Sequence, residues 1–196
     1  MSVLFEKSNT KLNLMKAFAG ESQAINRYTF SASQAKKEGL AVVERIFTYT
    51  ANQEREHAKQ FYNRLKPFGG QSIKIEADFP VDIYSSTLDL LKAAKSNEYG
   101  EYNDAYRNFA LEAKSEGFEE IAELFNSIAD IEKAHGDRFE NVAKLIESGE
   151  LFASNKEERW VCLNCGHIYT SKEALRLCTV CDHNQGYQIR ESWLAI

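Results

Sequence analysis

A pattern of glutamate and histidine that occurs twice constrains the fold of this 196-residue chain more than any other feature. In each half, a single Glu precedes a Glu-x-x-His motif: Glu21 comes before Glu54 and His57, and the second copy consists of Glu98, Glu132 and His135. Glu132 follows Glu54 at the same separation along the chain as His135 follows His57, and this separation is called here the repeat offset. Glu98 follows Glu21 at one residue less than the repeat offset. A Glu and a His three residues apart share one face of a helix, where both can bind one metal ion. The pattern therefore predicts two copies of a metal-binding helical hairpin.

The apolar periodicity predicts four long helices, each ended by glycine or proline. They cover residues 8–38, 40–65, 87–115 and 118–148. The connections after the first and third helices are short, whereas residues 71–85 form a long crossover. Four long helices with one long crossover predict an all-α, ferritin-like four-helix bundle.

The donors of the two hairpins lie at one level of this bundle. If Gly39 is the first hairpin tip, Glu21 lies as far before it along the chain as His57 lies after it. The donors of the second hairpin, counted from Gly117, agree with these heights within a helical turn at about 1.5 Å per residue. Surface residues of an ordinary bundle have no reason to match in height, so the pattern favours a two-metal site.

The four cysteines form two Cys-x-x-Cys motifs near the end of the chain. Four thiolates from two tight turns predict a tetrahedral site for zinc or a single iron. Its ligands are Cys162, Cys165, Cys178 and Cys181. We therefore expect a bundle over residues 1–149, a linker over 150–158 and a small metal-knuckle domain over 159–196.

Composition and charge limit the partners of the chain. With 43% hydrophobic and 27% charged residues it is typical of globular proteins. The net charge of −5 and the lack of a basic run argue against nucleic acid as a partner. No apolar stretch approaches the roughly 18 residues of a membrane span, and charges interrupt the N-terminal segment, unlike a secretory signal. We expect a cytoplasmic protein, because clustered cysteines suit metal binding in a reducing compartment.

On these motifs the chain resembles the rubrerythrin family over nearly its whole length. The resemblance rests on the bundle donors, on Glu101 and on the Cys-x-x-Cys-Gly-x-x-Tyr sequence that begins at Cys162. It implies a non-haem di-iron peroxidase that reduces hydrogen peroxide to water in oxidative stress defence. It also implies a rubredoxin-like domain with one iron, which receives electrons from rubredoxin or an NAD(P)H-dependent reductase. Rubredoxins usually carry Pro and Gly where this chain has Thr179 and Asp182, which leaves zinc open at this site.

Each bundle donor has an expected role. In the expected di-iron chemistry, Glu54 and Glu132 are the carboxylates that bridge the two irons. The other four form a terminal pair for each metal, Glu21 with His57 and Glu98 with His135.

Three further residues lie near these donors in the sequence. Glu101 has no counterpart in the first half, and we expect it to compete with His57 for one iron as the oxidation state changes. Tyr28 lies on the helix face of Glu21, and Tyr102 follows Glu101. Each either hydrogen-bonds a ligand carboxylate, passes protons or is a core residue.

Two other functions use the same features. A ferroxidase or iron-storage protein has the same bundle but needs a closed cage of many subunits. A binding module would dock a partner through a zinc ribbon at the cysteines and use the bundle as a scaffold. The tail starts roughly 20 Å along the fourth helix from the metal level, so we expect a homodimer or larger homo-oligomer in which the tail of one chain lies beside the bundle of another.

Overall fold

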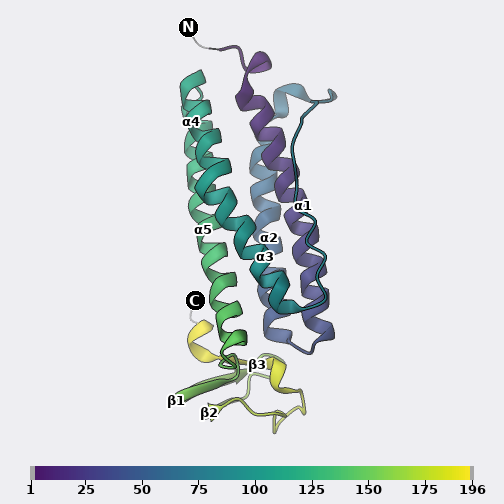
Figure 1. Ribbon diagram of the computed structural model, residues 1–196, viewed down its shortest axis with the longest axis vertical. Coiled ribbons are helices and arrows are strands. Elements are labelled where there is room, and N and C mark those ends of the chain that lie inside the picture. Colours follow the sequence, from purple (N-terminus) through teal and green to yellow (C-terminus); the bar gives the residue numbers. More distant parts are fainter. Residues whose placement is uncertain (1–2, 195–196) are drawn as a thin grey trace.

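The computed structural model describes residues 3–194, which form a tall helical bundle with a small β-sheet domain at one end (Figure 1). The bundle helices are α1 (Asn9–Lys37), α2 (Ala41–Arg64), α3 (Thr87–Gly100), α4 (Tyr106–Glu116) and α5 (Glu119–Glu147). Because α4 continues the column of α3, the bundle has four columns and one long crossover, as predicted. The outermost residues of the two expected domains, 1–2 and 195–196, lie outside the described range.

The helices end where the sequence provides glycine. Gly39, Gly117 and Gly149 follow α1, α4 and α5 with φ angles of 74°, 91° and 72°. This left-handed conformation is the one that glycine adopts at least cost. Ser8 and Ser86 cap the starts of α1 and α3, where the side chain of each accepts a hydrogen bond from a backbone N–H of the first turn.

One extra residue interrupts the third column. Glu98 follows Glu21 at one residue less than the repeat offset, whereas Tyr106 follows Tyr28 at the full offset, so the second half has one residue more between these positions. The π-helical segment Glu101–Ala105 lies at this place, and its wider turn accommodates the extra residue. The continuous third helix that periodicity predicts is therefore interrupted beside the expected metal site.

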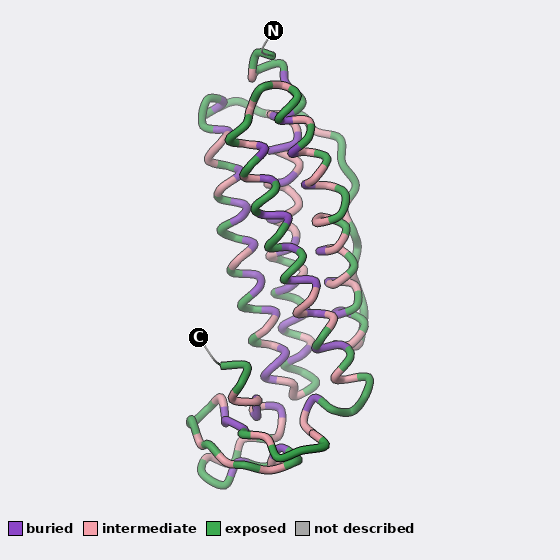
Figure 2. Tube along the Cα trace, turned by 90° about the vertical axis from the view of Figure 1, so that its left-hand side faces the viewer, coloured by how far each residue is buried: buried purple, intermediate pink, exposed green. Residues whose placement is uncertain are grey.

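The bundle interior consists of a polar layer between two apolar clusters. Buried residues recur along the inner side of the helices (Figure 2). Phe47 and Phe139 belong to the cluster near the β-sheet domain, and Phe61 and Phe125 belong to the cluster at the far end. The predicted donors lie between them along each helix, so apolar side chains enclose them from both ends.

The crossover between α2 and α3 runs along α1 (Figure 1). Arg27 of α1 and Asn97 of α3 both donate hydrogen bonds to Asp82 of the crossover, at 2.9 and 2.7 Å. Asp82 thus ties the crossover to two helices. Within residues 3–194, no helix has both the length and the apolarity that crossing a bilayer requires.

The tail forms an antiparallel sheet of β1 (Ala153–Cys162), β2 (Ile168–Glu173) and β3 (Gln188–Arg190) in the order β2-β1-β3. Strand β1 begins at Ala153, inside the segment 150–158 that we expected to be a linker. The charged residues of this segment hide the strand in the sequence, because its backbone pairs with β2 whatever its exposed side chains are.

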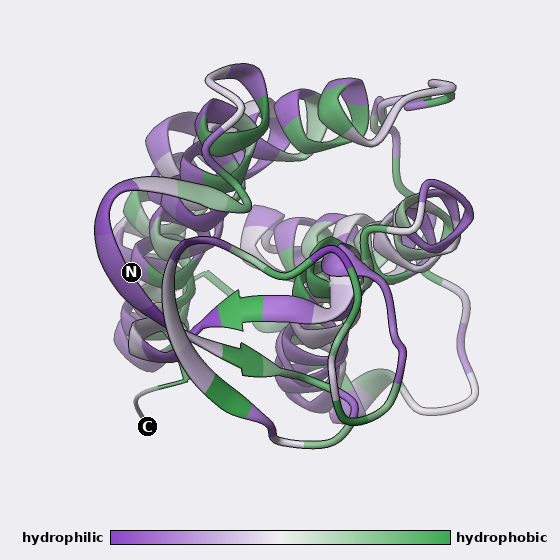
Figure 3. Ribbon diagram, turned by 90° about the horizontal axis from the view of Figure 1, so that it is seen from below, coloured by the Kyte–Doolittle hydropathy of each residue, from purple (hydrophilic) through white to green (hydrophobic). Residues whose placement is uncertain are grey.

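The tail packs closely against the turn between α1 and α2. Seen from below, its strands lie across the end of the bundle (Figure 3). A Cβ atom on Gly186 would lie 1.7 Å from the carbonyl oxygen of Gly39, so only glycine permits this contact. Val42 of α2 packs with Val161 and Ile189 of the tail. The tail is therefore docked on the bundle.

Candidate metal centres

The six donors that the repeat predicts converge in the bundle interior. They form two groups of four residues, and within each group one ligand atom per residue lies within 4.8 Å of the others. The groups are Glu21, Glu54, His57 and Glu132, and Glu54, Glu98, Glu132 and His135. Glu54 and Glu132 belong to both groups, as two bridging carboxylates must. None of the six residues is more than 7% exposed.

Both histidines direct Nδ1 at the two shared carboxylates. Nδ1 of His57 lies 2.9 Å from Glu54 Oε2 and 3.0 Å from Glu132 Oε1. Nδ1 of His135 lies 2.8 Å from the other oxygen of Glu54 and 2.9 Å from the other oxygen of Glu132. Each shared carboxylate therefore presents one oxygen to each side, which is the geometry of a bridge between two ions.

These buried donors lack enough hydrogen-bond partners among the described residues. The atoms without one include Glu21 Oε2, Glu54 Oε1, Glu98 Oε2, both oxygens of Glu132 and Nδ1 of His135. Buried polar atoms without partners are costly, and here they are the atoms that would bind metal. Carboxylate and imidazole donors suit iron, so the residues fit a di-iron centre.

The carboxylates also need positive charge. Burial, followed by repulsion from Glu132 and Glu54, raises the pKa of Glu21 well above its ordinary value. Burial and then Glu54 raise the pKa of Glu132 in the same way. Burial also raises the pKa of Glu54, but the contacts of Glu54 with His135 and His57 outweigh burial and lower this pKa to about 2. The two imidazoles therefore stabilise the ionised form of Glu54, and cations are needed to keep Glu21 and Glu132 ionised.

Two tyrosine hydroxyls hold the carboxylates of Glu98 and Glu21. Tyr28 donates to Glu98 Oε1, and Tyr106 donates to Glu21 Oε1 at 2.6 Å. Each tyrosine thus holds the glutamate of the other half. Tyr28 is among the residues that the sequence predicts but Tyr106 is not, although its position at the repeat offset from Tyr28 is the signal that finds it. Tyr102 instead packs against the apolar cluster at the far end of the bundle.

Glu101 lies beside the donors but belongs to neither group of four. It begins the π-helical turn and is half-buried. Burial, followed by the charges of Glu98 and Glu54, raises the pKa of its carboxyl well above the ordinary value. Glu101 follows Glu98 by three residues, and its carboxyl is not one of the converged donors.

The four cysteines converge at a second site in the tail. All four are free thiols, and their Sγ atoms lie within 4.8 Å of one another. Sγ of Cys162 is 3.7 Å from that of Cys181, and Sγ of Cys165 is 3.6 Å from that of Cys178. A tetrahedral ion with metal–sulfur bonds of about 2.3 Å needs sulfur separations of roughly 3.8 Å. The four thiols fit a single tetrahedral metal ion.

The two knuckles share one backbone conformation despite a sequence difference. Gly166 and Asp182 each follow the second cysteine of a motif, with φ angles of 76° and 56°. Their backbone N–H groups donate to the carbonyls of Cys162 and Cys178 at 2.8 and 2.9 Å. Aspartate tolerates the left-handed conformation better than most residues, so the departure from glycine at this position leaves the turn intact.

Comparison with known proteins identifies the family. Residues 13–143 match the family Rubrerythrin, and residues 160–187 match the rubredoxin-like domain of rubrerythrin. The chain belongs to the rubrerythrin family. It is 44% identical over 187 residues to a rubrerythrin of Porphyromonas gingivalis, a match that covers 95% of this chain and 92% of that protein.

Solved structures agree with this assignment. Fully reduced nigerythrin matches with a TM-score of 0.64 and 26% identity, over 97% of this chain and 88% of that one. A bacterioferritin of Desulfovibrio desulfuricans, which contains a diiron site, shares the fold of the bundle with a TM-score of 0.64 and 24% identity, over 72% of this chain and 82% of that one. The predicted ferritin-like bundle with a rubredoxin-like domain is confirmed. So are the predicted cofactor sites, a di-iron centre and a four-cysteine centre.

Proposed function

We propose that this rubrerythrin is a peroxidase that reduces hydrogen peroxide to water. The observation that carries the proposal is the pair of donor groups that share Glu54 and Glu132. When bound there, two ferrous ions supply the two electrons that, with two protons, convert one peroxide into two water molecules. We assign Glu54 and Glu132 as the bridging ligands, and we assign the terminal pairs as Glu21 with His57 and Glu98 with His135.

The surrounding residues prepare this site for the reaction. Tyr28 and Tyr106 orient the terminal carboxylates, and their hydroxyls are protonated donors at neutral pH. Apolar clusters above and below exclude water. Glu101 and His57 are alternative donors to one metal position, because a carboxylate favours ferric iron whereas a neutral imidazole favours ferrous iron.

Electrons enter through the tail in this proposal. The four cysteines would hold one iron, which would supply electrons to the bundle site one at a time. Cys165 is exposed, which gives an electron-donor protein access to the site. The donor is rubredoxin or an NAD(P)H-dependent reductase, and the free thiols suit a reducing cytoplasm. An absorption spectrum tests the metal, because ferric iron bound to thiolates is red whereas zinc is colourless.

Peroxide consumption by the iron-loaded protein tests the function. Glu54→Ala and Glu132→Ala should abolish turnover, because each removes a shared ligand. Cys162→Ser should retain a single turnover of prereduced protein but stop steady-state turnover with an external electron donor. Glu56→Ala is the matched control, since this neighbouring carboxylate is 62% exposed.

Two results would contradict the proposal. Iron analysis after anaerobic reconstitution should approach about three ions per chain, two in the bundle and one in the tail. A value near one would exclude the bundle site. A large closed assembly that oxidises ferrous iron but does not consume peroxide would favour the iron-storage function instead.

A further inference from the structure

The hydrogen bonds around His135 form a network that, among residues 3–194, has no counterpart at His57. Nε2 of His135, the ring nitrogen that points away from the metal donors, lies 3.0 Å from Oε1 of Gln53. Arg138 donates to the same Gln53 oxygen at 3.3 Å and to the hydroxyl of Thr50 at 3.0 Å. The other end of the amide, Nε2 of Gln53, donates to the hydroxyl of Tyr49 at 3.3 Å.

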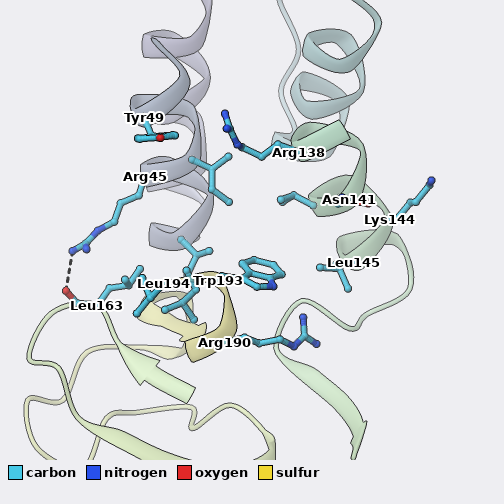
Figure 4. A pocket seen from close by; sticks show the side chains of 14 residues that line it. Arg45, Tyr49, Arg138, Asn141, Lys144, Leu145, Leu163, Arg190, Trp193 and Leu194 are labelled. Carbon is cyan, nitrogen blue, oxygen red and sulfur yellow. Dashed lines mark hydrogen bonds between the residues drawn. The ribbon is translucent and has the colours of Figure 1, made fainter. Parts of the chain in front are cut away.

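Arg138 decides which way the amide of Gln53 points. A guanidinium has only donors, so the atom of Gln53 that faces it must be the oxygen. The reversed amide would set an NH₂ group against the guanidinium and against His135. Arg138 lies between α2 and α5 at the edge of an open cavity, with its guanidinium over the ring of Tyr49, 5.1 Å from the ring centre (Figure 4).

The amide in turn decides where the proton of His135 resides. Oε1 of Gln53 only accepts, so the neutral ring must carry its hydrogen on Nε2. Nδ1 then has a free electron pair, and it is the atom that faces Glu54, Glu132 and Glu98. A residue that accepts a hydrogen bond from the other ring nitrogen of a ligand histidine fixes the orientation of the ring and strengthens metal binding.

The internal repeat shows that the network serves one metal position only. At the repeat offset, Gln53 corresponds to Ile131 and Arg138 corresponds to Gln60. Ile131 has no acceptor in its side chain, and the amide oxygen of Gln60 accepts from Arg64. The chain therefore contains a natural internal control, because Gln60 stands three residues after His57 as Arg138 stands three residues after His135.

We propose that Arg138 is a positioning residue. By orienting Gln53 it keeps the proton of His135 on Nε2, so that Nδ1 faces the metal position formed by Glu54, Glu98, Glu132 and His135, called here the Glu98 position. The proposal rests on the two-metal site of the proposed function. It assigns to Arg138 an effect on metal binding at a site that its side chain does not touch.

Titration of the metal-free full-length protein with Co²⁺ tests the proposal. Arg138→Met should weaken one of the two bundle positions by about 10- to 100-fold and leave the four-cysteine site unchanged. Gln60→Met, the matched control, should change neither bundle position. The double variant Arg138→Met with Gln53→Glu should recover binding, because a carboxylate accepts from His135 in either orientation and needs no arginine to orient it.

A second readout follows the proton itself. In the Zn²⁺-loaded protein labelled with ¹⁵N-histidine, the Nε2–H signal of His135 should be present and protected from exchange with water. In Arg138→Met this proton should exchange faster. Unchanged Co²⁺ affinities and an unchanged Nε2–H signal in Arg138→Met would overturn the role of Arg138 but would leave the two-metal site of the proposed function standing. A loss that the double variant does not recover would also overturn it, because the arginine would then act only by packing. Failure of the wild-type bundle to bind Co²⁺ would overturn the two-metal site as well.

Discussion

Tyr106 and Tyr28 hold Glu21 and Glu98 through hydrogen bonds that cross between the two halves of the repeat. Tyr106→Phe removes one of them and leaves the buried Glu21 carboxylate free to turn. We expect metal binding at the Glu21 position to weaken about tenfold, the lower end of the effect of such residues. Metal titration measures this.

Tyr102→Phe is the control for this prediction, because its ring packs in the apolar cluster and stacks under Arg107. Its metal affinity should equal that of the unsubstituted protein. Equal affinities for Tyr106→Phe and Tyr102→Phe would show that the hydrogen bond to Glu21 has no part in holding the metal.

How far the sequence predicts individual residues depends on whether the signal is local. The donors follow from Glu-x-x-His spacing on single helices and from their repetition, and the structure brings all six together. Residues that hold donors from another helix leave no such spacing. Tyr106 is detectable only through its offset from Tyr28, and Arg138 and Gln53 are not detectable because the repeat lacks their counterparts.

At the scale of helices and strands, sequence signals fix ends better than interiors. Predicted and observed ends of α1, α2 and α5 differ by only one residue, because glycine or proline follows each helix. The π-helical turn Glu101–Ala105 escapes prediction because apolar periodicity tolerates one extra residue. Its trace in the sequence is a change of offset: Glu98 follows Glu21 at one residue less than the repeat offset, whereas Tyr106 follows Tyr28 at the full offset.

Gly136 allows close contact between α3 and α5. A Cβ atom there would lie 2.6 Å from the ring of Tyr99, whose hydroxyl donates to Asp137 at 2.7 Å. Alanine favours the helix by roughly 1 kcal/mol over glycine, but forcing atoms into a packed contact costs about 1–3 kcal/mol. We expect Gly136→Ala to lower the free energy of unfolding by about 1 kcal/mol.

Denaturant unfolding followed by circular dichroism measures the free energy of unfolding. A double-mutant cycle with Tyr99 separates the gain in helix propensity from the cost of the clash. In a Tyr99→Ala background the clash is absent, so Gly136→Ala should instead stabilise the protein by up to about 1 kcal/mol. A stabilising effect in both backgrounds would mean that the ring of Tyr99 moves aside without cost.

At the scale of the whole molecule, the docked tail lies far from the di-iron level of its own chain. The tail contacts the turn at Gly39. His57 lies about 27 Å further along α2, at roughly 1.5 Å per residue. Electron transfer weakens steeply over such a distance. A second chain packed head to tail against the first would bring its tail to the metal level, so we propose that the active unit is a homodimer.

Mixing two inactive variants tests this assembly. Glu54→Ala has a defective bundle but an intact tail, and Cys162→Ser has the reverse. If electrons pass between chains, a heterodimer of the two contains one complete route of the two in a symmetric dimer, and it should regain about half of the activity. If electrons pass within a chain, the heterodimer contains no complete route. Heterodimers isolated through two different affinity tags and assayed for peroxide turnover distinguish these cases, and inactivity of heterodimers that bind their metals would exclude transfer between chains.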